Sequence, residues 1–307
     1  MTMEEPKEPL CGFINVLKPP GMTSAQVVGF VRRLLGGEKI GHAGTLDPEA
    51  SGVLPLMVGK AARLFDYMQD KEKAYVAEIA FGSATDTQDA QGTAIRVGDA
   101  YPTEQQIQGV IPSFTGTIQQ RPPMFSAIKK DGQRLYDLAR KGIEADIPTR
   151  EVTVNRLDYH GMTHKRGALL HVRCSKGFYV RTLCHDLGET LGCPAHMRFL
   201  LRIQSGVFTL DTAYTLEQLK EAADAGRLED VILEPSIALP HLPSCDVPKA
   251  LYKPLRNGGK LPWERFPALH GTKADDGAPF CLWMDGKLSA IGERVGDVIK
   301  VRSWLGQ

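Results

Sequence analysis

A glycine-rich run near the start of the chain holds the first residue whose type and setting could do chemistry. In GHAGTLDPEASG at 41–52, the carboxylate of Asp47 lies among small residues that let a bulky ring approach the backbone closely. Loops of this composition carry function more often than buried segments do. An ordinary interpretation competes, because aspartate before proline is typical of a helix N-cap with Pro48 at the first helical position. Spacing alone favours the cap, whereas the whole run favours a catalytic carboxylate.

Four further side chains could support such a carboxylate, although each also has an ordinary explanation. A neighbouring cation such as Arg181 would keep an aspartate ionised and oriented, but an arginine on a helix is more often a surface cation. Tyr75 lies on the apolar face of a predicted strand, where an aromatic ring usually belongs to the core. Lys18 in a turn and His42 beside the glycine-rich run are weak candidates when each is taken alone.

Several other chemistries lose support because their motifs are missing. The chain has no Walker A loop, no GxGxxG run after a strand, no HExxH and no GxSxG. A metal site would have to use cysteines and histidines that lack the CxxC spacing typical of zinc sites. These residues are Cys174, Cys184, His185, Cys193 and His196. We favour buried thiols and partly exposed imidazoles, and we predict no metal ion and no cofactor.

Hydrophobic periodicity predicts the elements that must position these residues. A short strand over 12–16 leads into a turn, and Thr23 or Ser24 then caps a helix that ends at Gly36–Gly37. Further strands are predicted at 75–81 and within 147–175, and further helices at 60–70, 103–111, 179–191 and 215–225, with a basic helix from about Arg134.

The length of 307 residues suggests two domains. The proline-containing stretch 235–248 is the best boundary, so we predict a catalytic domain over 1–244 and a small β domain over 245–307. A basic insertion near 120–150 belongs to the first domain. In the second, Asp285–Gly286 lies between two apolar runs, which is typical of a tight hairpin.

The distribution of charge favours a polyanionic partner. Residues 120–202 carry 15 Lys and Arg against 8 Asp and Glu, whereas residues 1–119 carry 10 against 14. No apolar run is long enough to cross a bilayer, and the acidic opening does not resemble a signal peptide. Six cysteines without a CxxC pair are typical of reduced thiols. We therefore predict a cytoplasmic protein without a membrane partner.

Five segments, taken together, resemble the TruB-type tRNA pseudouridine synthases, the family that modifies uridine 55 in the T loop. They are LKPPGMTS at 17–24, GHAGTLDPEASGVLPLMVGKAAR at 41–63, KAYVAEIAFGSATDTQDAQG at 73–92, RPPMFSAIKKDGQRLYDLARKG at 121–142 and SKGFYVRTLCHDLGETLG at 175–192. They follow one another in the order of the family and cover most of residues 12–202.

The resemblance implies an α+β fold, in which a mixed, largely antiparallel sheet has flanking helices and a small PUA-like β domain follows. It also implies that Asp47 is the catalytic aspartate, that Tyr75 is an active-site tyrosine and that Arg181 is the partner of Asp47. The positions that it assigns to substrate binding are Lys18, His42, Tyr179 and Leu200.

The implied function is isomerisation of uridine to pseudouridine in the T stem-loop of tRNA, by base flipping and an aspartate-dependent rearrangement of the glycosidic bond. The residues leave three routes open to Asp47: attack on the ribose, attack on the base, or removal of the 2′ proton. We expect a monomer that needs no protein partner. Two other classes remain, a non-catalytic RNA-binding protein and a glycosidase-like enzyme that acts on free nucleosides.

Overall fold

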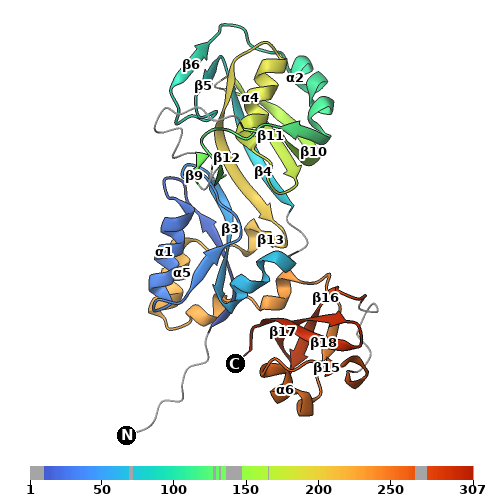
Figure 1. The fold of residues 1–307 in the computed structure, drawn as a ribbon. Helices are drawn as coiled ribbons and strands as arrows, with labels where there is room; N and C mark the ends of the chain where they lie inside the picture. The colour runs from blue at the N-terminus through green and yellow to red at the C-terminus, as the bar shows by residue number, and fades with distance from the viewer. Residues whose placement is uncertain are drawn as a thin grey trace.

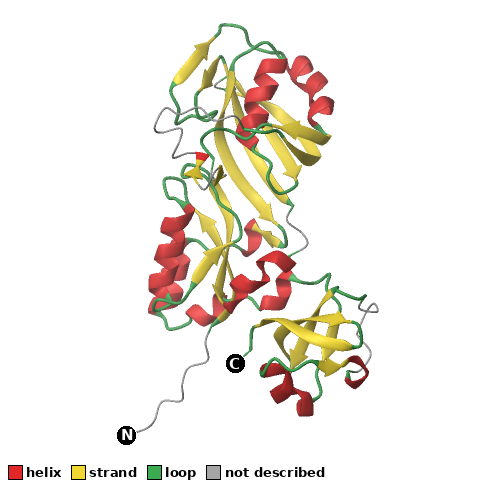
Figure 2. Cartoon of the chain, viewed as in Figure 1, coloured by secondary structure: helices red, strands yellow, loops and turns green. Residues whose placement is uncertain are grey.

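The computed structural model has a nine-stranded and a five-stranded β-sheet, with helices packed around the larger one, and two small two-stranded sheets (Figure 1). The residues that it describes are 10–68, 72–126, 129–130, 133–135, 147–164, 166–266 and 275–306. Figure 2 shows the larger sheet running the length of the main body, with the smaller sheet beside its lower end. No helix among the described residues is long and apolar enough to cross a membrane.

The larger sheet has nine strands and is antiparallel at all but one of its pairings. Its strands are β1 (Cys11–Lys18), β2 (Ile40–His42), β3 (Ser51–Gly59), β4 (Lys73–Phe81), β7 (Gly116–Gln120), β10 (Arg150–Thr163), β11 (Gly167–Cys174), β12 (Ala195–Ser205) and β13 (Phe208–Thr209). The main order is β1-β3-β12-β4-β11-β10-β7, with β2 beside β3 and β13 beside β12. This arrangement confirms the predicted mixed, largely antiparallel sheet.

The single parallel pairing joins two halves of this sheet. There β3 and β12 meet over only two residue pairs, Leu201 with Ser51 and Arg202 with Gly52. Helices α1 (Ser24–Leu34) and α5 (Leu216–Asp224) pack on the β1–β3 half, and α2 (Glu104–Val110) and α4 (Val180–Thr190) pack on the other (Figure 1). Each half therefore has its own apolar core.

Three helices begin with the same capping arrangement. The side chains of Thr23, Thr103 and Thr215 each accept a hydrogen bond from the backbone N–H of a glutamine three residues later. The side-chain oxygen of that glutamine accepts a hydrogen bond from the backbone N–H of the threonine. Such capping boxes satisfy N–H groups that the first turn leaves unpaired. The helices predicted near 24–35, 103–111, 179–191 and 215–225 are confirmed to within about one residue at their starts.

The structure corrects two local predictions. The helix predicted over 60–70 is a 3₁₀ helix, η1 (Lys60–Tyr67), and its buried residues Ala61 and Leu64 are three apart, the repeat of a 3₁₀ turn. The run GSATDTQDAQG at 82–92 has the composition of a polar turn, but the structure forms a hairpin around it, of β5 (Ser83–Thr85) and β6 (Ala94–Val97). The remaining short elements of the first domain are η2 (Ile111–Phe114), β8 (Lys129–Lys130), β9 (Gln133–Arg134), η3 (Leu210–Thr212), η4 (Leu228–Val231) and η5 (Pro235–Ala238).

Most of the predicted basic helix from Arg134 lies outside the described residues. The same holds for a large part of the insertion predicted near 120–150.

The smaller sheet has five strands in the order β14-β16-β17-β18-β15. These are β14 (Ser244–Asp246), β15 (Leu261–Pro262), β16 (Pro279–Met284), β17 (Lys287–Val295) and β18 (Val298–Trp304), accompanied by η6 (Lys249–Leu251), α6 (Tyr252–Arg256) and η7 (Trp263–Arg265). The predicted hairpin is confirmed: Asp285 and Gly286, with φ of 49° and 74°, connect β16 to β17. Positive φ at both central residues is typical of a type I′ turn.

Candidate active site

The loop between β2 and β3 carries Asp47 and is not followed by a helix. The N-cap interpretation of Asp47 is therefore wrong, and its carbonyl instead accepts a turn hydrogen bond from the N–H of Ala50 at 3.1 Å. The buried Ser24, at the start of α1, holds the middle of the loop. Its hydroxyl donates to the carbonyl of Leu46 at 3.1 Å and accepts from the N–H of Leu46 at 2.9 Å.

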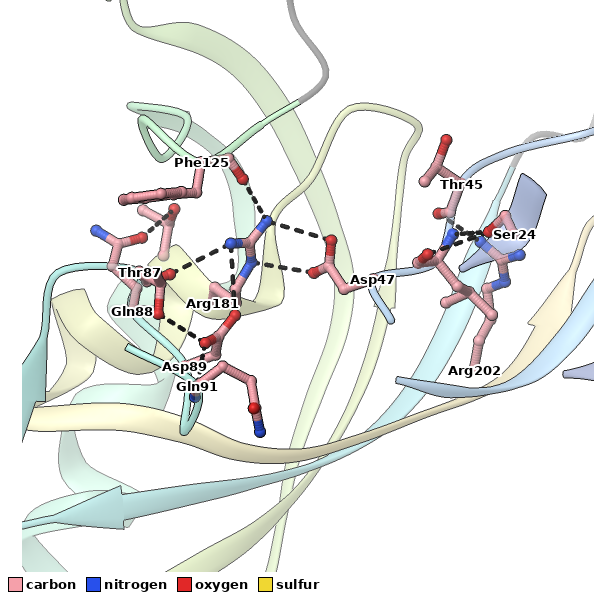
Figure 3. A network of polar contacts seen from close by, with 12 residues as sticks. Ser24, Thr45, Asp47, Thr87, Gln88, Asp89, Gln91, Phe125, Arg181 and Arg202 are labelled. Carbon is pink, nitrogen blue, oxygen red and sulfur yellow. Dashed lines mark hydrogen bonds and ion pairs between the residues drawn. The ribbon is translucent and has the colours of Figure 1, made fainter. Parts of the chain in front are cut away.

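Asp47 meets Arg181, which lies in the first turn of α4, in a two-pronged ion pair (Figure 3). Arg181 Nε lies 3.1 Å from Oδ2 of Asp47, and Arg181 Nη2 lies 3.4 Å from Oδ1. Two parallel contacts fix the plane of a carboxylate as well as its position. The structure thus brings together two residues that are 134 positions apart in the sequence.

The rest of the Arg181 guanidinium is held by groups that the sequence did not single out. Nη1 donates to the carbonyl of Thr87 at 3.2 Å and lies 3.5 Å from Oδ2 of Asp89, while Nη2 donates to the carbonyl of Phe125 at 2.9 Å. Asp89 is itself fixed, because its Oδ1 accepts from the hydroxyl of Thr87 and the N–H of Gln91. Arg181 is therefore shared between two carboxylates.

The electrostatic setting of Asp47 combines burial with one open side. Burial raises the pKa of this carboxyl group above its ordinary value, because loss of water disfavours the charged form. The guanidinium of Arg181 lowers the pKa, Asp89 raises it, and Lys18 lowers it to a smaller extent. The Asp47 side chain nevertheless keeps 38% of its surface exposed, so a ligand can reach it.

Tyr75 lies in β4 with its ring in the core that also contains Leu46, Ala50 and Leu200. The ring is 7% exposed, and burial raises the pKa of its hydroxyl to about 12. The hydroxyl is therefore protonated at neutral pH. The negative charge of Asp47 also raises this pKa slightly, which agrees with the two side chains lying near each other.

Lys18 ends β1 and is fully buried. Its Nζ donates to the carbonyls of Pro19, Pro48 and Ala50 at 2.7 to 2.8 Å, so its three N–H groups all hold backbone around the loop. Burial lowers its pKa to about 8. The Lys18 ammonium group therefore holds the backbone around the loop and has no N–H group left for a ligand.

His42 and Tyr179 flank the loop. His42 ends β2, and burial together with the charge of Arg202 lowers its pKa, which favours the neutral imidazole. Tyr179 caps α4, and its N–H and C=O both bond the amide of Gln120 at 2.8 and 3.0 Å. The electric fields of Arg181 and Asp47 both reach the Tyr179 hydroxyl.

The cysteine and histidine group considered for a metal does not assemble in the described part of the chain. Cys174, Cys184 and Cys193 are buried in the core beneath α4. His196 Nδ1 instead lies 2.8 Å from the carbonyl of Ser83. His185 pairs with its neighbour Asp186.

A desolvated carboxylate with a raised pKa, held by a buried arginine beside a buried tyrosine, is typical of enzyme active sites. The fold and this geometry together indicate an enzyme whose candidate active site contains the ion pair of Asp47 with Arg181.

Comparisons with known proteins give this enzyme its family. Residues 32–180 match the model of the TruB family pseudouridylate synthase N-terminal domain, and residues 181–239 match that of the tRNA pseudouridylate synthase B C-terminal domain. The chain belongs to the TruB family and is a pseudouridine synthase.

Relatives and solved structures agree with this assignment. The tRNA pseudouridine synthase B of Geobacter sulfurreducens is 44% identical over 285 residues, which cover 92% of this chain and 93% of that protein. The same-named protein of Heliobacterium modesticaldum is 39% identical over 307 residues, covering 99% and 95%. A crystal structure of a Cbf5-Nop10-Gar1 complex contains a chain that superposes with a TM-score of 0.72 at 28% identity, covering 95% of this chain and 84% of that one.

Proposed function

We propose that this protein converts uridine 55 in the T loop of tRNA to pseudouridine, with Asp47 as the catalytic carboxylate. The observation that carries the proposal is the ion pair of Asp47 with the buried Arg181, on an open-sided loop of a TruB-family chain. tRNA as the substrate is supported by the names of relatives that align over more than nine tenths of both chains. We also propose that the chain works as a monomer without a protein partner.

The reaction rearranges bonds without a net loss of atoms. The N1–C1′ glycosidic bond breaks, the uracil turns, and a C5–C1′ bond forms. A proton then leaves C5, and the nitrogen released from the sugar carries a proton in the product. Attack by Asp47 on C1′, attack on the base, and removal of the 2′ proton all require an ionised carboxylate next to the nucleotide. The two contacts from Arg181 keep Asp47 ionised and aimed for any of these routes.

Tyr75 is proposed to stack on the uracil and to take part in proton removal from C5. The flipped base needs a flat apolar surface, and base–aromatic stacking contributes about 1–3 kcal/mol. With a pKa of about 12, the hydroxyl serves as a hydrogen-bonding group and a relay for a proton rather than as a permanent phenolate.

The substrate base must leave its stack, because neither C1′ nor C5 can be reached inside folded RNA. We propose that the neutral ring of His42 fills part of the vacated space and that Tyr179 and Leu200 line the site of the flipped base. Lys18 is proposed to act indirectly, by holding the carbonyls of Pro48 and Ala50 on either side of Glu49.

The test is release of tritium from tRNA transcript that carries 5-tritiated uridine, using the purified chain alone. The parent should release one equivalent per tRNA, and Asp47→Asn should release none. A transcript with cytidine at position 55 should also release none. Equal release from that control would refute the T-loop assignment while leaving the activity in place.

Two further measurements test the two alternative classes of protein, a non-catalytic RNA-binding protein and an enzyme that acts on free nucleosides. Tight tRNA binding without tritium release from the parent would indicate a non-catalytic RNA-binding protein. Conversion of free uridine as fast as tRNA would indicate an enzyme that acts on nucleosides.

A further inference from the structure

Arg202, in the middle of β12, is the largest fully buried side chain in the described part of the molecule. Its hydrogen bonds go to backbone: Nε donates to the carbonyl of Val53 at 2.7 Å, Nη2 to that of Gly44 at 3.1 Å and Nη1 to that of Thr45 at 3.4 Å. Among the described residues, no carboxylate lies within ion-pair distance of this guanidinium. A buried cation without a counter-ion is costly, which makes its placement informative.

Two of these three carbonyls belong to the loop that carries Asp47. Gly44 and Thr45 precede Asp47 by three and two residues, and Figure 3 shows the Arg202 guanidinium beside this part of the loop. The backbone passes very close to the cation: a Cβ on Gly44 would lie 3.8 Å from Arg202 Nη1 and 3.3 Å from Lys73 Nζ. Arg202 therefore fixes the N-terminal side of the loop.

The other side of the loop has a separate anchor. Lys18 holds the carbonyls of Pro48 and Ala50, and Ser24 holds both backbone groups of Leu46. None of these bonds reaches Tyr75.

Arg202 does reach Tyr75. The two residues are direct cross-strand neighbours in the β12–β4 pairing, and the positive charge of Arg202 lowers the pKa of the Tyr75 hydroxyl, as expected for a guanidinium close to it. Arg202 also faces Gly52 across the short parallel pairing that joins the two halves of the sheet. One guanidinium thus contacts the loop of one half and the tyrosine of the other.

We propose that Arg202 is a positioning residue that sets the Tyr75 hydroxyl relative to the loop bearing Asp47. This inference rests on the roles proposed above for Asp47 and Tyr75. The planar guanidinium donates in several fixed directions, which lets it serve a tyrosine and the loop at once. A lysine at this position would keep the positive charge but could not donate hydrogen bonds in the several fixed directions of the guanidinium.

The first experiment compares Arg202→Lys with the parent in single-turnover tritium release under saturating enzyme. Misplacement of reacting groups by about 1 Å costs on the order of 100-fold in rate, so a fall of about that size is expected. The dissociation constant for tRNA should stay unchanged. The matched control is Arg198→Lys on the same strand, where the arginine pairs with Glu78 at 2.6 Å and the rate should be preserved. Equal rates for Arg202→Lys and the control would overturn the proposal.

A double-mutant cycle with Tyr75→Phe tests whether the effect passes through the tyrosine hydroxyl. If Arg202 orients that hydroxyl, Arg202→Lys should slow the Tyr75→Phe enzyme much less than it slows the parent. Full additivity of the two effects would show that Arg202 acts independently of the Tyr75 hydroxyl, and it would overturn the proposal. All rates are measured below the onset of thermal unfolding of the least stable variant.

If Arg202→Lys does not fold, the parent and Tyr75→Phe proteins are compared by NMR of the arginine Nε–H groups. The resonance of one buried arginine should shift on loss of the hydroxyl, and no shift at any buried arginine would overturn the proposal. Full activity of Asp47→Asn would instead refute the proposed function, whatever the behaviour of Arg202.

Discussion

Every N–H group of the Arg181 guanidinium has an acceptor within reach. Asp47 takes two, the carbonyls of Thr87 and Phe125 take one each, and Asp89 lies near Nη1. Because a guanidinium has five donors, few orientations would satisfy all of them, so this side chain can hold Asp47 in a single pose. These contacts fix the orientation of Asp47, the residue proposed as the catalytic carboxylate.

Replacing Arg181 with methionine should abolish this control. Asp47 would lose its neighbouring cation, and leaving a buried charge without its partner costs about 3–5 kcal/mol. We expect tritium release to fall by orders of magnitude, while tRNA affinity, measured by filter binding, stays close to that of the parent. Turnover near the parent rate would show that the ion pair is dispensable.

Replacing Tyr75 with phenylalanine should separate stacking from proton transfer. The ring remains, so tRNA affinity should be retained. The hydroxyl is lost, and general acid–base groups typically contribute about 10²- to 10⁴-fold to a rate. Single-turnover tritium release checks this, and a rate equal to the parent would leave Tyr75 with a stacking role only.

The negative charge of Asp89 should be visible in the pH dependence. If Asp47 is the catalytic carboxylate, as proposed, the rate should be lost as pH falls through its pKa, which burial has raised and Asp89 raises further. Asp89→Asn removes one negative charge and should lower that pKa, which moves the acid limb of the rate profile to lower pH.

The matched control for this shift is Asp86→Asn in the same turn, where the carboxylate accepts from the N–H of Thr93. Its acid limb should coincide with that of the parent. An acid limb that stays in place, or moves to higher pH, in Asp89→Asn would contradict the electrostatic argument.

The sequence predicted the residues that a family motif names but not those that serve them. Asp47 and Arg181 were found because they lie in recognisable runs, although only the fold could show them in contact. Asp89 was hidden in a segment with the composition of a turn. Arg202 left a weaker signal, since it lies two residues from the buried Leu200 on the same face of the strand. The acceptors that accompany its burial are backbone atoms, which no sequence pattern shows.

At the scale of elements, local signals were strong where side chains bond their own backbone. The helix capped by Thr23 was predicted because the cap and the apolar stripe lie within a few residues of each other. The helices predicted over 103–111 and 215–225 begin with the same capping box, formed by Thr103 and Thr215. The pairing of β3 with β12 was not predicted, because it joins segments about 150 residues apart and is parallel over two residue pairs only. That pairing is what places Asp47 and Tyr75 in one site.

Gly52 allows the close approach of β3 to β12. Its φ is +115°, and an added Cβ would lie 2.1 Å from the carbonyl oxygen of Arg202 on the facing strand. Gly52→Ala should therefore separate β3 from β12 and destabilise the protein by about 3 kcal/mol or more, with loss of activity. Thermal or urea unfolding measures the change.

The control for this prediction is Gly21→Ala. Gly21 also has a positive φ, +79°, but nothing lies within 4 Å of the added Cβ. Its cost should be only the backbone strain of about 1–2 kcal/mol. Equal destabilisation by the two substitutions would show that the close approach at Gly52 is unimportant.

At the scale of the whole molecule, the two units share an apolar cluster. Phe13, Met57 and Leu64 of the first unit belong to the same cluster as Leu288 and Ile291 of the second. Backbone carbonyls near the C-terminus add polar contacts, since Lys60 Nζ donates to Gly306 and Arg63 Nη1 to Trp304. Deleting the second unit would expose this cluster, so truncation alone cannot isolate a role in RNA binding.

Charge substitution on the second unit isolates that role. Lys253 and Arg256 lie on α6 and line a groove between the two units, and both are exposed. If they contact duplex phosphates, Lys253→Ala/Arg256→Ala should weaken tRNA binding and lower the slope of log affinity against log salt by about 1.8, at about 0.9 per contact. Tritium release from bound tRNA should be unaffected, because α6 contributes no residue to the Asp47 site.

The comparison variant is Lys220→Ala/Arg227→Ala, which removes two exposed cations from the acidic segment 203–245. Its salt slope should match that of the parent, since one of these cations already pairs with Asp224 and the local field repels phosphate. Equal slopes for all three proteins would assign the second unit to stability rather than to RNA contact. A reduced slope for the α6 variant alone would establish it as part of the tRNA-binding surface, with the shared apolar cluster fixing its position relative to Asp47.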